Sequence, residues 1–132
     1  MVRIVDYKSG KDRRQFESVE SLFGDNEKKR NKAVFQLLFY TMILERQGSH
    51  SGTPAMYSAN EIYRENFDPL IQMGRGAGAF VPDIGLMRNE ILPQFKDRVH
   101  ELIREIFDPE IPFKHRDPEI PCKFCNRAGF PT

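Results

Sequence analysis

The chain opens with alternating hydrophobic and polar positions. β-Branched residues are frequent from Val2 to Tyr7, and this stretch ends at the turn-forming pair Ser9-Gly10. The pattern predicts a β-strand. Domains rarely begin with a core strand, so we expect the sequence to be truncated at its N-terminus and to start partway through a larger domain.

Helical periodicity follows this strand. Residues 11–24 are charged and weakly patterned, which favours a loop with one or two helical turns. Asp25 or Asn26 can then cap a helix that runs to about Gln47 and stops at Gly48. The middle of this helix is apolar on nearly every side, so we expect it to be buried.

Shorter elements are expected in the second half of the chain. Residues 49–54 are predicted to form a polar loop, residues 55–63 an exposed strand or hairpin arm, and residues 70–84 a strand followed by a turn. An amphipathic helix is expected over residues 86–107, and the proline-rich tail 109–132 should be extended. The mixture of elements predicts an α/β fold with a mixed sheet flanked by helices.

Composition is that of a folded protein. The 132 residues are 39% hydrophobic and 30% charged, which is typical of one globular domain. The longest apolar stretch, residues 33–44, is shorter than the roughly 20 residues that span a bilayer. The N-terminus also lacks the pattern of a signal peptide. We therefore expect a cytoplasmic protein without a membrane partner.

The net charge of +1 hides an uneven distribution. A basic surface attracts nucleic-acid phosphates, although a solvated helix start would give the same pattern. The basic residues of the first third are Arg3, Lys8, Lys11, Arg13, Arg14, Lys28, Lys29, Arg30 and Lys32.

Asp6 and Lys8 are the first candidates for chemistry. Side chains two apart on a strand point to the same face, so a carboxylate and an ammonium lie together. The carboxylate can hold Mg²⁺, and the lysine can position or help deprotonate a water and offset phosphate charge. This pair suits hydrolysis of a phosphodiester. The alternative is a surface ion pair of little value to stability.

Gln36 and Tyr40 form the second constellation, because residues four apart share one helix face. An amide inside an apolar helix must find hydrogen-bond partners. Lys29 and Lys32 extend this polar stripe toward the helix start. The alternative is a glutamine and a tyrosine satisfied by neighbouring backbone.

Together the two motifs carry a resemblance. A strand ending in Val-Asp-Tyr-Lys-Ser-Gly, a variable charged loop and a helix with Gln-x-x-x-Tyr are similar to the nuclease domain of RecB-type and AddB-type exonucleases in the PD-(D/E)XK superfamily. The similarity covers residues 2–45 closely and the remainder loosely. It implies a restriction-endonuclease-like core, with residues 1–132 as the C-terminal portion of a nuclease domain.

The resemblance also implies roles. Asp6 would be a ligand of Mg²⁺ or Mn²⁺, joined by the backbone carbonyl of Tyr7, and Lys8 would be the catalytic lysine. Gln36 and Tyr40 would contact the nucleic-acid strand or orient the site. The implied activity is metal-dependent DNA hydrolysis in repair or recombination, by an exonuclease or a helicase-associated module. Its partners would be a single strand or duplex end, and a helicase subunit or domain.

One departure from the family changes this expectation. Such domains normally supply another metal-binding aspartate from a preceding strand and a ligand from an earlier helix, but only five residues precede Asp6. We expect weak metal binding and an isolated chain that is inactive or nearly so. The alternative is a catalytically incomplete domain that binds DNA or protein. A purely structural domain would leave the four side chains dispersed, and exposed sheet edges would favour a homodimer.

Cys122 and Cys125 could form half of a zinc site or part of an iron-sulfur cluster. Four thiolates are usual for such a cluster, and the chain has two cysteines. His100 and His115 could complete a mixed cysteine–histidine metal site, although their spacing does not require it. We expect two free thiols, which fit a reducing compartment. The glycines of residues 74–78 lack the context of a phosphate-binding loop and are expected to form a turn.

Overall fold

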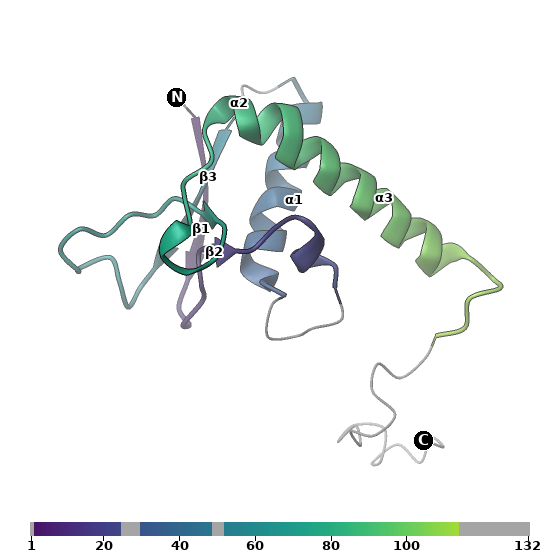
Figure 1. Cartoon of the computed structure of the whole chain (residues 1–132), viewed down its shortest axis with the longest axis horizontal. Helices are drawn as coiled ribbons and strands as arrows, with labels where there is room; N and C mark the ends of the chain where they lie inside the picture. The colour runs from purple at the N-terminus through teal and green to yellow at the C-terminus, as the bar shows by residue number, and fades with distance from the viewer. Residues whose placement is uncertain (1, 25–29, 49–51, 114–132) are drawn as a thin grey trace, which may run out of the picture. The chain divides into compact units, whose positions relative to one another are not determined.

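The computed structural model describes residues 2–24, 30–48 and 52–113 (Figure 1). The chain divides into two compact units, Met1–Glu101 and Leu102–Thr132, and the motifs of the first strand and first helix lie in the first unit. The main elements in order are β1 (Val2–Lys8), β2 (Gln15–Phe16), α1 (Lys32–Arg46), β3 (Gly52–Ser58), β4 (Gln72–Met73), α2 (Ile84–Leu86) and α3 (Leu92–Phe107).

Two pairs of parallel strands form the sheets. β1 pairs with β3 over its full length, from Val2 opposite Gly52 to Lys8 opposite Ser58, and β2 pairs with β4. Antiparallel pairing among the described residues is limited to two isolated bridges, at positions 55 and 70 and at 73 and 80. Parallel neighbours need a crossover, and α1 supplies it between β1 and β3. The predicted α/β class, with helices flanking the strands, is confirmed.

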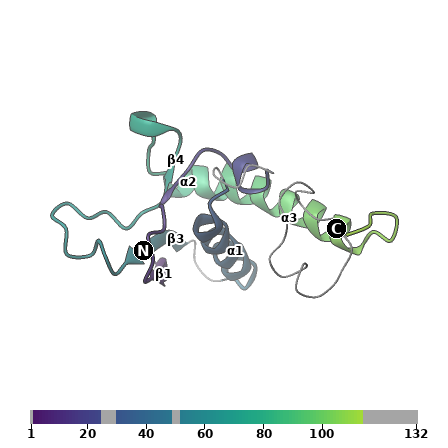
Figure 2. The same cartoon turned by 90° about the horizontal axis from the view of Figure 1, so that it is seen from below.

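Helix α1 packs against β1 and β3 (Figures 1 and 2). Its fully buried positions recur on one face, as expected for a helix on a sheet, and Phe35, Phe39 and Met42 add partly buried flanks. Tyr40 is 43% exposed, so burial is less complete than the apolar sequence predicted. The buried face consists of Ala33, Val34, Leu37, Leu38 and Thr41.

The predicted start of this helix is wrong. Asp25 and Asn26 lie outside the described residues, but Asn31 is extended and caps the helix at Lys32. The Asn31 Oδ1 accepts a hydrogen bond from the Val34 N–H at 3.1 Å, while its Nδ2 donates to the carbonyls of Arg13 and Gln15. These long-range bonds select the cap. The predicted stop is confirmed, because Gly48 follows the helix with a φ of 72°.

Replacing Asn31 by alanine is expected to lower the free energy of unfolding by about 2 to 3 kcal/mol. The change removes a helix cap and takes the amide donor away from the carbonyls of Arg13 and Gln15. Asn31 is only 7% exposed, so water cannot easily replace that donor. Urea denaturation followed by circular dichroism measures the loss. Asn31→Asp, which keeps the cap acceptor but not the donor, should fall between the two proteins. A loss below about 0.5 kcal/mol for the alanine variant would contradict this account of the cap.

The expected polar loop at 49–54 and exposed strand at 55–63 are also corrected from residue 52 onward, since residues 49–51 lie outside the described part of the chain. β3 already begins at Gly52, ends at Ser58 and is largely buried. β1 pairs with one edge of this strand, and on the other edge the Met56 N–H donates to the Pro69 carbonyl at 2.7 Å. Helix α1 packs against the strand, and Met56 lies in the core. The small residues of this strand gave no hydrophobic pattern, so the burial could not be seen in the sequence.

Residues 11–24 contain a helical turn, as predicted, in the short 3₁₀ turn at Glu20–Leu22. They also contain β2, which the sequence did not predict. The C-terminal helix starts two residues before the predicted Leu86 as α2, which Asp83 caps, and passes through a π-helical segment, Met87–Ile91, before α3. It ends at Phe107 as predicted. No helix in the described part of the chain is long and apolar enough to cross a membrane.

The predicted apolar face of the last helix is buried over only half of its length. Ile91, Phe95 and Val99 lie in the core, whereas Leu102, Ile103 and Ile106 in the second unit are 39–47% exposed. The core of the first unit joins side chains from every main element of that unit except α2 and β4. Its largest fully buried members are Phe16, Leu22, Leu37, Leu38, Met56, Ile71 and Phe95.

Candidate active site

The end of β1 brings Asp6 and Lys8 together. Ile4, two residues earlier on the same face, is buried in the core, while Tyr7 on the other face is 79% exposed. This alternation turns Asp6 and Lys8 toward α1. The Lys8 Nζ lies 2.8 Å from the Asp6 Oδ2, and the two side chains are 20% and 17% exposed. The pair is therefore mostly shielded from solvent rather than displayed on the surface.

Helix α1 presents Gln36 and Tyr40 to this pair. The Gln36 Oε1 accepts a hydrogen bond from the Lys8 Nζ at 2.7 Å, and the Gln36 Nε2 donates to the Tyr40 hydroxyl at 2.8 Å. The four side chains thus form one continuous polar chain between the strand and the helix. The dispersed arrangement expected of a purely structural domain is not what the structure shows.

Asp6 has an unusual environment. Its Oδ2 is buried and receives no well-aligned hydrogen bond from the described residues, although the Lys8 ammonium lies close to it. A buried carboxylate oxygen in this state suits a hard cation, which prefers oxygen ligands. Within the described ranges, however, no group of three or more aspartate, glutamate, histidine or cysteine side chains is arranged to hold a metal. The donor set in this part of the chain is therefore partial.

The other predicted site residues are placed as follows. Lys32 is exposed at the first position of α1, one turn before Gln36. Lys29, Cys122, Cys125 and His115 lie outside the described residues, and His100 is exposed on α3. The predicted turn at residues 74–78 is confirmed, with a short 3₁₀ turn at Gly76–Gly78 that Gly74 precedes. A Cβ at Gly74, which has a φ of 119°, would lie 3.1 Å from the Ala79 Cα, so this turn requires glycine.

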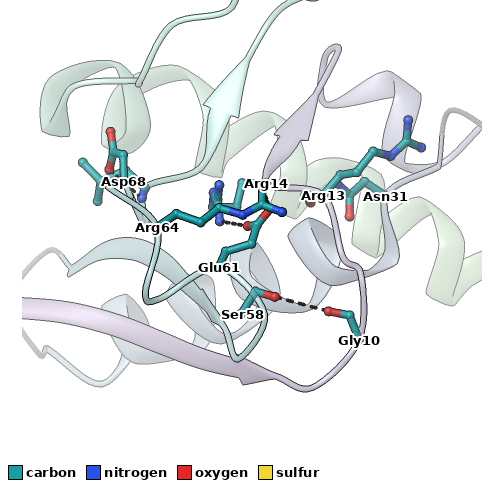
Figure 3. A network of polar contacts seen from close by, with 9 residues as sticks. Gly10, Arg13, Arg14, Asn31, Ser58, Glu61, Arg64 and Asp68 are labelled. Carbon is teal, nitrogen blue, oxygen red and sulfur yellow. Dashed lines mark hydrogen bonds and ion pairs between the residues drawn. The ribbon is translucent and has the colours of Figure 1, made fainter. Parts of the chain in front are cut away.

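The segment after Lys8 is fixed by contacts that the sequence did not reveal (Figure 3). The Lys8 carbonyl accepts from the Ala59 N–H at 2.9 Å, and the Ser58 Oγ donates to the Gly10 carbonyl at 3.3 Å. Arg14 and Glu61 form an ion pair of 2.5 Å although they are 47 residues apart. No pattern along the chain marks that pair. Asn31 could have been found, because a cap-forming residue stands directly before an apolar run.

Comparison with known proteins places this geometry in a family. No curated protein and no solved structure gives a significant match. Residues 1–129 match the family model described as the PD-(D/E)XK nuclease superfamily. This match includes β1, α1 and all four side chains of the polar chain. The protein therefore belongs to the PD-(D/E)XK nuclease superfamily.

Proposed function

We propose that Asp6, Lys8, Gln36 and Tyr40 are the hydrolytic centre of a DNA phosphodiesterase. Membership of the superfamily implies metal-dependent nuclease activity on DNA, with a divalent metal such as Mg²⁺. One observation carries the assignment to these residues. The Lys8 ammonium is held between the Asp6 Oδ2 at 2.8 Å and the Gln36 Oε1 at 2.7 Å. Such a fixed, shielded ammonium is suited to a phosphate oxygen, whereas a surface ion pair needs no amide from a second element.

Each side chain then has a role that its surroundings support. Asp6, with its buried and poorly bonded oxygen, would hold the cation, and the Tyr7 backbone carbonyl would be a second ligand. A divalent cation supplies Lewis-acid stabilisation of phosphate charge and a more acidic water. Lys8 would orient the water or bind a phosphate oxygen. Gln36 would fix Lys8, and the half-exposed Tyr40 hydroxyl would donate to the DNA strand.

The finer proposal is a RecB-type or AddB-type exonuclease module that acts on a single strand or duplex end in DNA repair. Its support is the order of the two motifs, Asp-x-Lys at the end of β1 and Gln-x-x-x-Tyr in α1. On this proposal the chain is the C-terminal portion of a nuclease domain, uses Mg²⁺ or Mn²⁺ and works with a helicase subunit or domain. Lys29 and Lys32 would contribute to DNA binding.

A second candidate function follows from the partial donor set. Because the described residues bring one carboxylate to the site, we propose that this polypeptide alone binds metal weakly and cleaves slowly. A catalytically incomplete nuclease-fold domain that binds DNA or protein is the corresponding alternative. Robust magnesium-dependent cleavage by the 132-residue polypeptide would contradict it.

The experiment that tests the centre measures Mn²⁺ binding by electron paramagnetic resonance. We expect weak binding, with a dissociation constant on the order of 10⁻⁴ to 10⁻³ M as in cation sites of low ligand charge. Asp6→Asn should weaken binding at least about tenfold, since the cation loses its anionic ligand. Asp97→Asn, which changes an exposed carboxylate of α3, is the matched control. Equal binding by the Asp6 and Asp97 variants would remove Asp6 from the proposed centre.

A further inference from the structure

We infer that a depression beside the end of β1 binds a phosphate of a single DNA strand, outside the four-residue centre. It lies between residues 11–13 and residues 58–64 and has a volume of about 310 Å³. One water occupies about 30 Å³ of the liquid, so a hydrated phosphate group has room there. The inference rests on the proposed function, because it names a second contact of the same substrate.

The position of this depression follows from the chain path. Both of its walls continue directly from the paired strands, since residues 9–13 leave β1 after Lys8 and residues 59–64 leave β3 after Ser58. The walls are joined by a hydrogen bond from the Ser58 Oγ to the Gly10 carbonyl (Figure 3). The Asn60 Nδ2 also donates to the Ser9 carbonyl at 3.4 Å. A single DNA strand bound at Lys8 could therefore extend along a surface whose shape these hydrogen bonds fix.

Charge favours an anion in this place. The lining includes the cationic side chains of Lys11 and Arg64 and the carboxylates of Asp12 and Glu61. The Glu61 charge is balanced from outside the lining, because its Oε2 lies 2.5 Å from the Arg14 Nη1. Phe67 in turn supports the Arg14 guanidinium, which stands 4.9 Å from the ring centroid. With Glu61 neutralised by Arg14, the net charge of the lining side chains is positive, which favours binding of a phosphodiester.

Arg64 is the side chain best suited to hold the phosphate. It is 71% exposed, and its Nη1 lies 3.6 Å from the Glu61 Oε1, beyond good hydrogen-bond distance. A guanidinium carries five N–H donors, so donors remain for phosphate oxygens. Arg14, by contrast, is engaged by Glu61 and serves to position that carboxylate.

Tyr63 supplies a second, independent feature that points to a nucleic-acid strand. It precedes Arg64 in the same turn and is 91% exposed, which leaves its ring faces accessible. Exposed aromatic rings beside cationic side chains stack nucleobases without sequence preference. A phosphate in the depression and a base on Tyr63 would together bind one nucleotide.

The test is binding of a fluorescein-labelled short oligothymidylate, followed by anisotropy in EDTA so that cleavage plays no part. We expect Arg64→Gln to weaken the affinity about threefold to tenfold and to reduce the slope of log affinity against log salt by about 0.7, the value for one phosphate contact of a single strand. Tyr63→Ala should weaken affinity at least about fivefold, and Tyr63→Phe should restore it. Arg88→Gln, an exposed arginine elsewhere in the first unit, should bind like the unchanged protein.

Further measurements distinguish a site for a DNA strand from a site for free anions, and failure of this inference from failure of the proposed function. Inorganic phosphate should fail to compete at the same phosphate concentration, and equal competition would mean a site for free anions rather than for a DNA strand. Equal affinity of the Arg64→Gln and Arg88→Gln proteins would overturn the inference, whatever their cleavage. If the proposed catalytic function fails instead, cleavage will be absent while binding and its dependence on Arg64 persist.

Discussion

Replacing Lys8 by methionine is expected to slow manganese-supported cleavage of a single DNA strand by roughly 10²- to 10⁴-fold, the usual contribution of a positioned proton-transfer or charge-stabilising group. Methionine keeps an unbranched side chain of similar length but removes the ammonium between Asp6 and Gln36. The lost charge acts on the phosphate, whose negative charge must be stabilised as the bond breaks. The effect should therefore appear in kcat more than in KM.

The measurement uses an end-labelled oligonucleotide at saturating Mn²⁺, because weak metal binding is expected and must not limit the rate. Lys96→Met, which makes the same change at an exposed position of α3, is the matched control and should cleave at the rate of the unchanged protein. Circular dichroism melting shows that each variant is folded. Equal rates for the Lys8 and Lys96 variants would end the catalytic assignment of Lys8.

The two faces that carry these four side chains were predictable, because local periodicity decides which side chains share a face. The strand period of two puts Asp6 and Lys8 on one face, and the helical spacing of four puts Gln36 and Tyr40 on another. The motif resemblance then predicted that the two faces meet, and the hydrogen bond from the Lys8 Nζ to the Gln36 Oε1 joins them. The chemical roles of the residues stay predictions, as does the cytoplasmic location.

The features that the sequence did not predict depend on contacts between residues far apart in the chain. The start of α1 is set by Asn31, whose amide bonds to Arg13 and Gln15 exist only in the folded chain. The burial of β3 depends on partners at both edges and on α1, and the small residues of the strand indicate none of these contacts. The Arg14–Glu61 pair, which shapes the depression beside Lys8, likewise joins two loops through the fold alone. The local sequence pattern predicts which face of a helix or strand carries which side chains. Long-range hydrogen bonds determine where a helix begins and what covers the edges of a strand.

Substituting Phe95 by alanine is expected to cost about 3 to 5 kcal/mol of unfolding free energy. The ring is 0% exposed, and its centroid lies 5.4 Å from that of Phe23 and 5.1 Å from that of Phe35. Truncation removes the transfer energy of the ring, leaves a cavity and breaks two aromatic contacts. Because small domains are stable by about 5 to 15 kcal/mol, this single change removes a large share of the total.

Urea denaturation measures this loss, with Phe107→Ala as the matched control, since Phe107 lies on the same helix but is 81% exposed and should cost about 0.5 kcal/mol or less. Similar losses for both variants would show that the aromatic cluster is not the core of the first unit. Phe35 precedes Gln36 on α1, so the cluster also fixes the helix that holds Lys8. The milder Phe95→Leu should therefore lower cleavage before it unfolds the chain, because the site depends on where that helix is packed.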